Sequence, residues 1–268
     1  EPATKEADQR KQDYTRALRP DALKGARIGV LRWATGWHAG VDARFEAALA
    51  VLRAQGAILV DVTTAPDRRQ ISLNENKVLM TELKADLNAY LATAAPAVTT
   101  RTLAEVIAFN KAHAAQEMTL FGQDTFEKAQ MTMGLDDPDY IKARETAQRL
   151  AGPEGIDRLI AQSNSVALIA PTAPPAWFID PVNADQAPFG GAGGLAAVAG
   201  YPHLTVPMGG VMGLPVGLSF IGPKWSEAQL LALGYAFEQA APEMTLTANF
   251  LPDIESQPEV DLLFHPAR

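Results

Sequence analysis

The chain contains six serines as candidate nucleophiles, and cysteine is absent. A serine attacks a carbonyl carbon only when a neighbouring base removes its proton. No serine lies in a G-x-S-x-G stretch, and without cysteine no Cys–His pair exists. The sequence therefore predicts neither the usual α/β-hydrolase site nor a papain-like site. The serines are Ser72, Ser163, Ser165, Ser219, Ser226 and Ser256.

A proline-rich segment, residues 171–191, holds the first candidates for a binding site. Loops of about twenty residues are uncommon in compact domains and are often functional. Trp177 and Phe178 would supply apolar walls, and Asp180 a carboxylate that orients a substrate amine or amide. We therefore expect an ordered, substrate-binding loop.

A second set of candidates lies in a helical region, at Phe121, Gln123 and Phe126. The two aromatic rings would line a pocket and the amide would orient a substrate, but ordinary core packing explains the rings equally well. At the end of the proline-rich segment, Gly190 and Gly191 permit close approach of the backbone to a ligand or to a strand. Both interpretations of these glycines remain open.

Metal and nucleotide sites find little support. His113 and Glu117 are four residues apart on a predicted helix, but no third ligand is evident, so a solvated face is favoured. The string GGAGGLAA differs from the G-x-G-x-x-G of dinucleotide-binding folds. We expect no metal and no organic cofactor.

The elements that must position these residues alternate between strands and helices. Residues 27–32 and 58–62 are short apolar runs separated by a helical stripe at Val41, Phe45, Ala48, Leu49 and Leu52. This order is typical of a βαβ unit with parallel strands.

A long helical span follows, with an apolar stripe at Leu79, Leu83, Leu87, Tyr90 and Leu91. Thr102 to Glu105 and Asp137-Pro138 have the composition of helix starts. Gly152-Pro153 predicts the end of a helix.

Strands are predicted again at residues 166–170, 203–208 and 215–221, the last two after the small-residue run GGAGGLAA. Ser226 to Gln229 matches a capping box that opens a final helix.

Three spaced stretches in the last third of the chain, GYPHLTVPMG, GLPVGLSFIGP and LLALGYAFEQA, resemble the C-terminal signature of the amidase signature family of serine hydrolases. The resemblance implies an α/β fold with a mixed, largely parallel sheet flanked by helices. It also implies hydrolysis of a carboxamide by a Ser-Ser-Lys mechanism without a cofactor.

The Gly-Gly-Ser-Ser-Gly-Gly stretch that carries the family's serines is missing from this chain. We therefore expect residues 1–268 to be a single domain, the C-terminal part of an amidase whose catalytic residues precede Glu1 in an N-terminal half. The isolated chain is expected to be inactive. The alternative is a non-catalytic binding or interaction module that reuses this half of the fold.

Within the family the chain is most similar to bacterial peptide amidases, through residues 82–92, 102–118 and 121–130. The expected substrate is a small amide, such as a peptide C-terminal amide. A homo-oligomer is possible, because missing strands would leave a sheet edge exposed.

The net charge is −8, from 23 Lys and Arg against 31 Asp and Glu, which argues against nucleic acid or an anionic membrane as partners. No apolar run reaches the ~18 residues of a membrane span. We expect a soluble protein of the cytoplasm or the periplasm.

Overall fold

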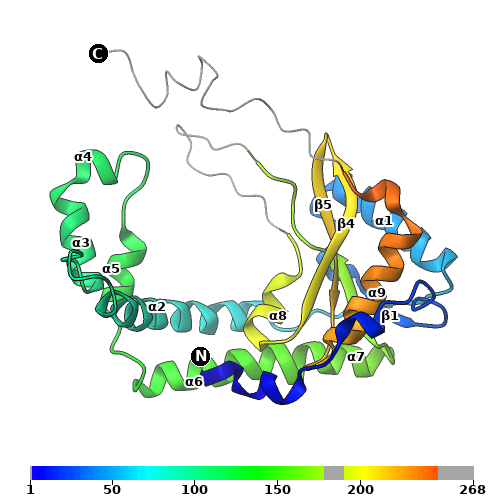
Figure 1. Cartoon of the computed structure of the whole chain (residues 1–268), viewed down its shortest axis with the longest axis horizontal. Helices are drawn as coiled ribbons and strands as arrows, with labels where there is room; N and C mark the ends of the chain where they lie inside the picture. Colours follow the sequence, from blue (N-terminus) through cyan, green and yellow to red (C-terminus); the bar gives the residue numbers. More distant parts are fainter. Residues whose placement is uncertain (1, 178–189, 247–268) are drawn as a thin grey trace, which may run out of the picture.

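The computed structural model describes residues 2–177 and 190–246. It shows a five-stranded sheet with helices on both faces, and a helical arm that extends from the sheet (Figure 1). The strands are β1 Arg27–Leu31, β2 Ile58–Val62, β3 Ala167–Pro171, β4 His203–Val211 and β5 Leu214–Ile221. The helices are α1 Ala39–Ala54, α2 Arg68–Ala92, α3 Leu103–Ala112, α4 Ala114–Glu117, α5 Asp124–Gln130, α6 Pro138–Ala151, α7 Arg158–Ser163, α8 Gly193–Ala199 and α9 Glu227–Ala240. Shorter helical turns are Pro2–Arg10, Tyr14–Ala17, Arg32–Ala34, Gly152–Asp157 and Pro242–Met244.

The strand order is β2-β1-β3-β5-β4. β1 is parallel to β2 and β3, whereas β5 is antiparallel to β3 and β4. The predicted βαβ unit and the mixed α/β sheet are confirmed. Parallel and antiparallel pairings are equal in number because the β4–β5 hairpin joins the sheet beside β3.

One face of the sheet packs against α1 and α9. All five residues of the predicted stripe on α1 are buried in this cluster. Phe220 of β5 meets Phe237 of α9 edge to face, with ring centroids 6.4 Å apart. Gly56 follows α1 with φ +86°, the left-handed geometry of a helix C-terminal glycine.

The opposite face packs against α7, α8 and the turn that joins α6 to α7. The predicted helix end at Gly152-Pro153 is instead a π-helical turn, residues 152–157, that continues into α7. Gly152 gives the ring of Tyr201 room there, because a Cβ would lie 3.2 Å from that ring. Tyr201 in turn donates a 2.6 Å hydrogen bond to Asp157.

The helical arm consists of the distal half of α2 with α3, α4 and α5 (Figure 1). Lys84 of α2 donates hydrogen bonds to the carbonyl oxygens of Gln130 and Thr132, at the C-terminal end of α5. The predicted α2 stripe is poorly covered, since Leu79 is 52% and Tyr90 71% exposed.

The predicted helix starts differ in how they are capped. Thr102 and Asp137 both accept backbone N–H bonds as N-caps, as expected. Ser226 does not, because its hydroxyl donates to Pro223 O at 2.7 Å. The sequence pattern places the residue correctly but does not determine the direction of its hydroxyl.

Candidate functional site

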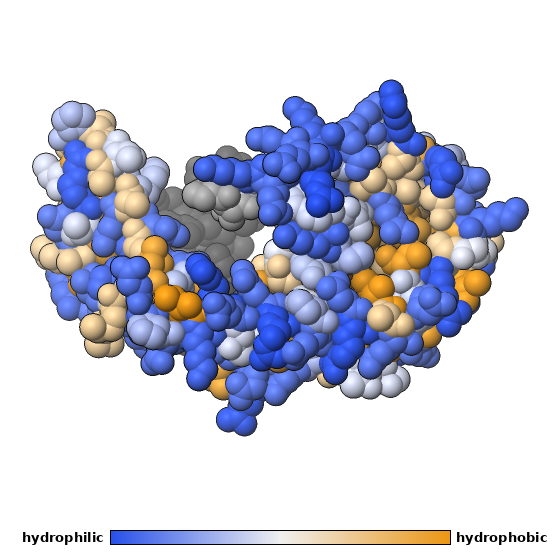
Figure 2. Space-filling model, turned by 90° about the horizontal axis from the view of Figure 1, so that it is seen from below, coloured by the Kyte–Doolittle hydropathy of each residue, from blue (hydrophilic) through white to orange (hydrophobic). Residues whose placement is uncertain are grey.

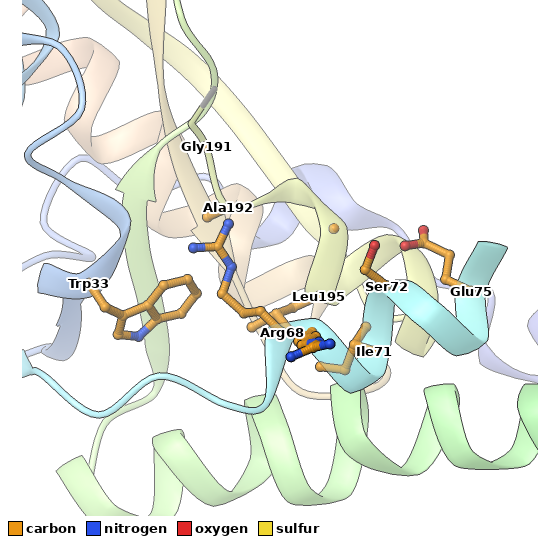
Figure 3. A pocket seen from close by; sticks show the side chains of 10 residues that line it. Trp33, Arg68, Ile71, Ser72, Glu75, Gly191, Ala192 and Leu195 are labelled. Carbon is orange, nitrogen blue, oxygen red and sulfur yellow. The ribbon is translucent and has the colours of Figure 1, made fainter. Parts of the chain in front are cut away.

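A pocket of about 400 Å³ lies where the chain leaves the carboxyl ends of the three parallel strands (Figure 3). The chain passes from β1 to Trp33, from β2 to the start of α2, and from β3 to Thr172. Carboxyl ends of parallel strands are the usual ligand position in α/β sheets. We call this the Trp33 pocket; it is lined by Trp33, Arg68, Arg69, Ile71, Ser72, Glu75, Gly191, Ala192, Gly194 and Leu195.

One side of the Trp33 pocket is cationic and aromatic. The guanidinium of Arg68 lies 5.5 Å from the centre of the Trp33 ring, within cation–π distance. Neither Arg68 nor Arg69 forms an ion pair with any residue in the described part of the chain. Both positive charges are therefore available to a ligand.

The other side of the pocket is hydroxylic and anionic. Ser72 and Glu75 lie one and two turns beyond Arg68 on the same face of α2, and Figure 3 shows them across the pocket from Trp33. Asp67 caps this helix by accepting a hydrogen bond from Gln70 N at 3.0 Å, which fixes where the first turn begins.

Two glycines from the predicted site lie at this end of the sheet. Gly191 lines the pocket with φ +97°, and a Cβ there would collide with Thr172 O. Gly190, at φ +139°, would collide with the ring of Trp37. The backbone thus needs glycine at both positions, and only Gly191 reaches the pocket lining.

The other predicted site residues lie elsewhere. Phe121, Gln123 and Phe126 are on the arm, where Phe121 is 79% exposed and Gln123 is held by Asn110 and Ile107. Figure 2 shows the molecular outline indented between this arm and the rest of the protein.

In the proline-rich segment, Trp177 is 46% exposed and lies outside the pocket lining. Phe178 and Asp180 fall outside the described residues.

Sequence reasoning missed the polar residues of the pocket. Trp33, Arg68, Ser72 and Glu75 belong to no motif. The sequence does contain a positional clue to two of them, because Trp33 and Arg68 follow two strands predicted to be parallel. Applying the carboxyl-end rule to those strands would have selected both.

No described serine combines a hydroxyl that is open to a pocket with a hydrogen-bonded base, because Ser219, which contacts His203, is fully buried. Ser163 and Ser165 are buried and hydrogen-bonded to each other at 2.6 Å, and Ser226 is bonded to a carbonyl. Ser72 opens to the pocket, but its hydroxyl contacts no lysine or histidine among the described residues.

A hydrogen-bonded row of side chains crosses β4 and β5 beside this region. The buried hydroxyl of Ser219 donates to Thr172 at 2.8 Å, so the His203 Nε2, 2.6 Å away, must act as its donor. Thr172 and Thr205 are 2.7 Å apart, in space left by the missing side chain of Gly217. Burial lowers the pKa of His203, which favours the neutral ring.

Comparison with known proteins decides the family. The sequence model described as Amidase matches residues 1–231. The chain belongs to the amidase family. Similarity to solved structures includes the native peptide amidase of Stenotrophomonas maltophilia, at 46% identity and a TM-score of 0.76, over 85% of this chain and 45% of that one. The predicted resemblance to bacterial peptide amidases is confirmed.

Curated relatives include a probable amidase of Arabidopsis thaliana, 29% identical over 85% of this chain and 40% of its own length. A glutamyl-tRNA(Gln) amidotransferase protein of Thermosynechococcus vestitus is 31% identical over 86% of this chain and 48% of its own. The amidase chain thus spans about half or less of the length of these relatives.

Across residues 2–177 and 190–246, no helix is long and apolar enough to cross a membrane. Within the same ranges, no group of three His, Asp or Glu side chains is arranged to hold a metal ion.

Proposed function

We propose that this amidase chain takes part in the hydrolysis of a carboxamide to a carboxylic acid and ammonia, with a peptide C-terminal amide as the substrate. The similarity to peptide amidase, at 45–46% identity over 85–86% of the chain, is the observation that carries the proposal. The position of the Trp33 pocket supports it, because cationic and apolar groups converge there.

The nucleophile is proposed to come from outside these 268 residues. The chain lacks a Gly-Gly-Ser-Ser-Gly-Gly stretch, and the one described serine that contacts a base, Ser219 beside His203, is fully buried. Residues 1–268 would then be the C-terminal part of one amidase domain, supplying pocket walls to a Ser-Ser-Lys centre in an N-terminal half. In that mechanism a neutral lysine accepts the nucleophile's proton through the second serine, and backbone N–H groups hold the oxyanion.

The proposal is tested by measuring hydrolysis of an amino-acid amide through the ammonia that is released. The measurement compares the natural protein, its length established by intact mass, with the isolated 268-residue chain. We expect activity in a natural protein of about twice this mass and none in the isolated chain. Activity in the isolated chain would place the nucleophile among its own serines. No activity in either would favour the binding-module alternative.

A further inference from the structure

The charged groups of the Trp33 pocket are separated along one helix. Arg68 and Glu75 are seven residues apart on α2, which corresponds to about 10.5 Å along the helix axis. Seven residues make nearly two full turns, so both side chains lie on the face that lines the pocket. The pocket therefore has a positive end and a negative end.

Neither end is neutralised within the described residues. Glu75 forms no ion pair there, and it is the one acidic residue in the pocket lining. Arg144 lines the adjoining cavity with Glu75, but its guanidinium lies 5.6 Å from the Tyr140 ring and donates to the Tyr140 hydroxyl. Glu75 thus remains available to a cation that enters the pocket.

The pocket wall between the positive and negative ends is suited to contact with peptide side chains of intermediate polarity. Ile71, Ala192 and Leu195 are buried apolar residues, and Ser72 lies between the charges. An extended peptide spans about 3.3–3.6 Å per residue, so three residues match the rise of about 10.5 Å between the Arg68 and Glu75 positions on the helix.

We propose that the Trp33 pocket is a subsite for short peptide amides with a free α-amine: Glu75 binds the ammonium group, and Arg68 donates hydrogen bonds to a carbonyl oxygen near the C-terminal amide. The inference deepens the proposed function, on which the choice of a peptide amide rests. In this inference Glu75 discriminates between peptides with free and blocked amino termini, because only an ammonium group forms a charge-assisted hydrogen bond with the carboxylate.

The test uses the full-length natural protein and two substrates, Ala-Ala-Phe amide and its N-acetyl derivative. Glu75→Gln should raise KM for the free-amine peptide about tenfold and leave its kcat unchanged. The KM and kcat for the N-acetyl peptide should not change. Arg68→Met should raise KM for both substrates, because both retain the carbonyl. Asp86→Asn is the matched control, since Asp86 is an exposed carboxylate on the same helix outside the pocket.

Equal effects of Glu75→Gln on the two substrates, or no effect on either, would overturn the inference. If the unmodified protein hydrolyses neither peptide, the proposed function fails instead. Calorimetric titration of both peptides then tests the inference separately. Weaker binding of the free-amine peptide to Glu75→Gln than to the unmodified protein supports it. Equal binding to the two proteins, or no detectable binding to the unmodified protein, overturns it.

Discussion

At the scale of single residues, the pocket depends on positions where a side chain has no room. Gly191 combines a left-handed backbone with close contact to Thr172 O, so both the conformation and the space require glycine. Gly194, three residues away in α8, has open space around its Cα and no such backbone requirement.

Gly191→Ala should lower the free energy of unfolding by about 1–3 kcal/mol, because the added Cβ strains the backbone and meets a carbonyl oxygen. Gly194→Ala is the matched control and should change stability by less than about 1 kcal/mol, in the stabilising direction. Urea denaturation of the two variants checks the difference. Equal destabilisation would show that the Gly191 contact does not matter.

A second residue-scale prediction concerns pH. Burial, reinforced by the hydrogen bond to Asp157, raises the pKa of Tyr201 to about 12. A phenol whose pKa is raised by folding contributes stability that is complete below its unfolded pKa of about 10 and is lost as the pH rises toward 12.

Tyr201→Phe should therefore lower the free energy of unfolding by about 1 kcal/mol at pH 8, a modest loss because the hydrogen bond to Asp157 is partly solvated. The difference between the two proteins should shrink between pH 10 and pH 12. Unfolding measured at several pH values tests this, and a difference that does not vary with pH would contradict it.

At the scale of elements, the arm is attached by polar contacts more than by a core. Leu103 and Ala129 are the buried apolar residues of α3 and α5, whereas Phe109, Phe121 and Met131 are exposed. Lys84 completes the end of α5 by donating to two carbonyl oxygens that the helix leaves unpaired.

Lys84→Met should loosen α5 without changing the sheet, because the two carbonyl oxygens lose their donor while the aliphatic stem is kept. We expect hydrogen exchange in residues 124–132 to accelerate about five- to thirtyfold. Lys128→Met, which removes a surface pair with Asp124, is the control and should have little effect. Uniform acceleration throughout the chain would contradict the prediction.

At the scale of the whole molecule, stability is unevenly distributed. Two apolar clusters hold the faces of the sheet, one containing Phe220 and the other Leu168. The arm extends from this body and contributes to neither cluster (Figure 1). The body and the arm should therefore open as separate cooperative units.

Phe220→Ala should lower the free energy of unfolding in the main transition by about 3–5 kcal/mol, as for other buried aromatic residues. Leu103→Ala, at an equally buried site of the arm, should instead increase hydrogen exchange in α3 and α5 while leaving that transition within about 1 kcal/mol. Denaturation and hydrogen exchange measured on both variants distinguish the units. Equal loss in the main transition would mean that arm and sheet fold as one.

The sequence by itself determined what depends on local periodicity and on family-specific strings. The α1 stripe, the bounds of β2 and the parallel β1–β2 pair follow from the spacing of apolar residues, which the chain must bury in any fold. The strings around His203 and Leu218 were sufficient to predict the family.

Only the tertiary structure decided which polar residues meet. Trp33, Glu75 and Gly191 are far apart in the chain and converge because parallel strands bring their carboxyl ends together. It also separated Phe121 from Gly191 by placing them on the arm and at the sheet, although the sequence offers both as candidates for substrate binding. Periodicity reports which face of an element is buried, whereas side-chain convergence depends on how elements cross, and local sequence does not encode that crossing.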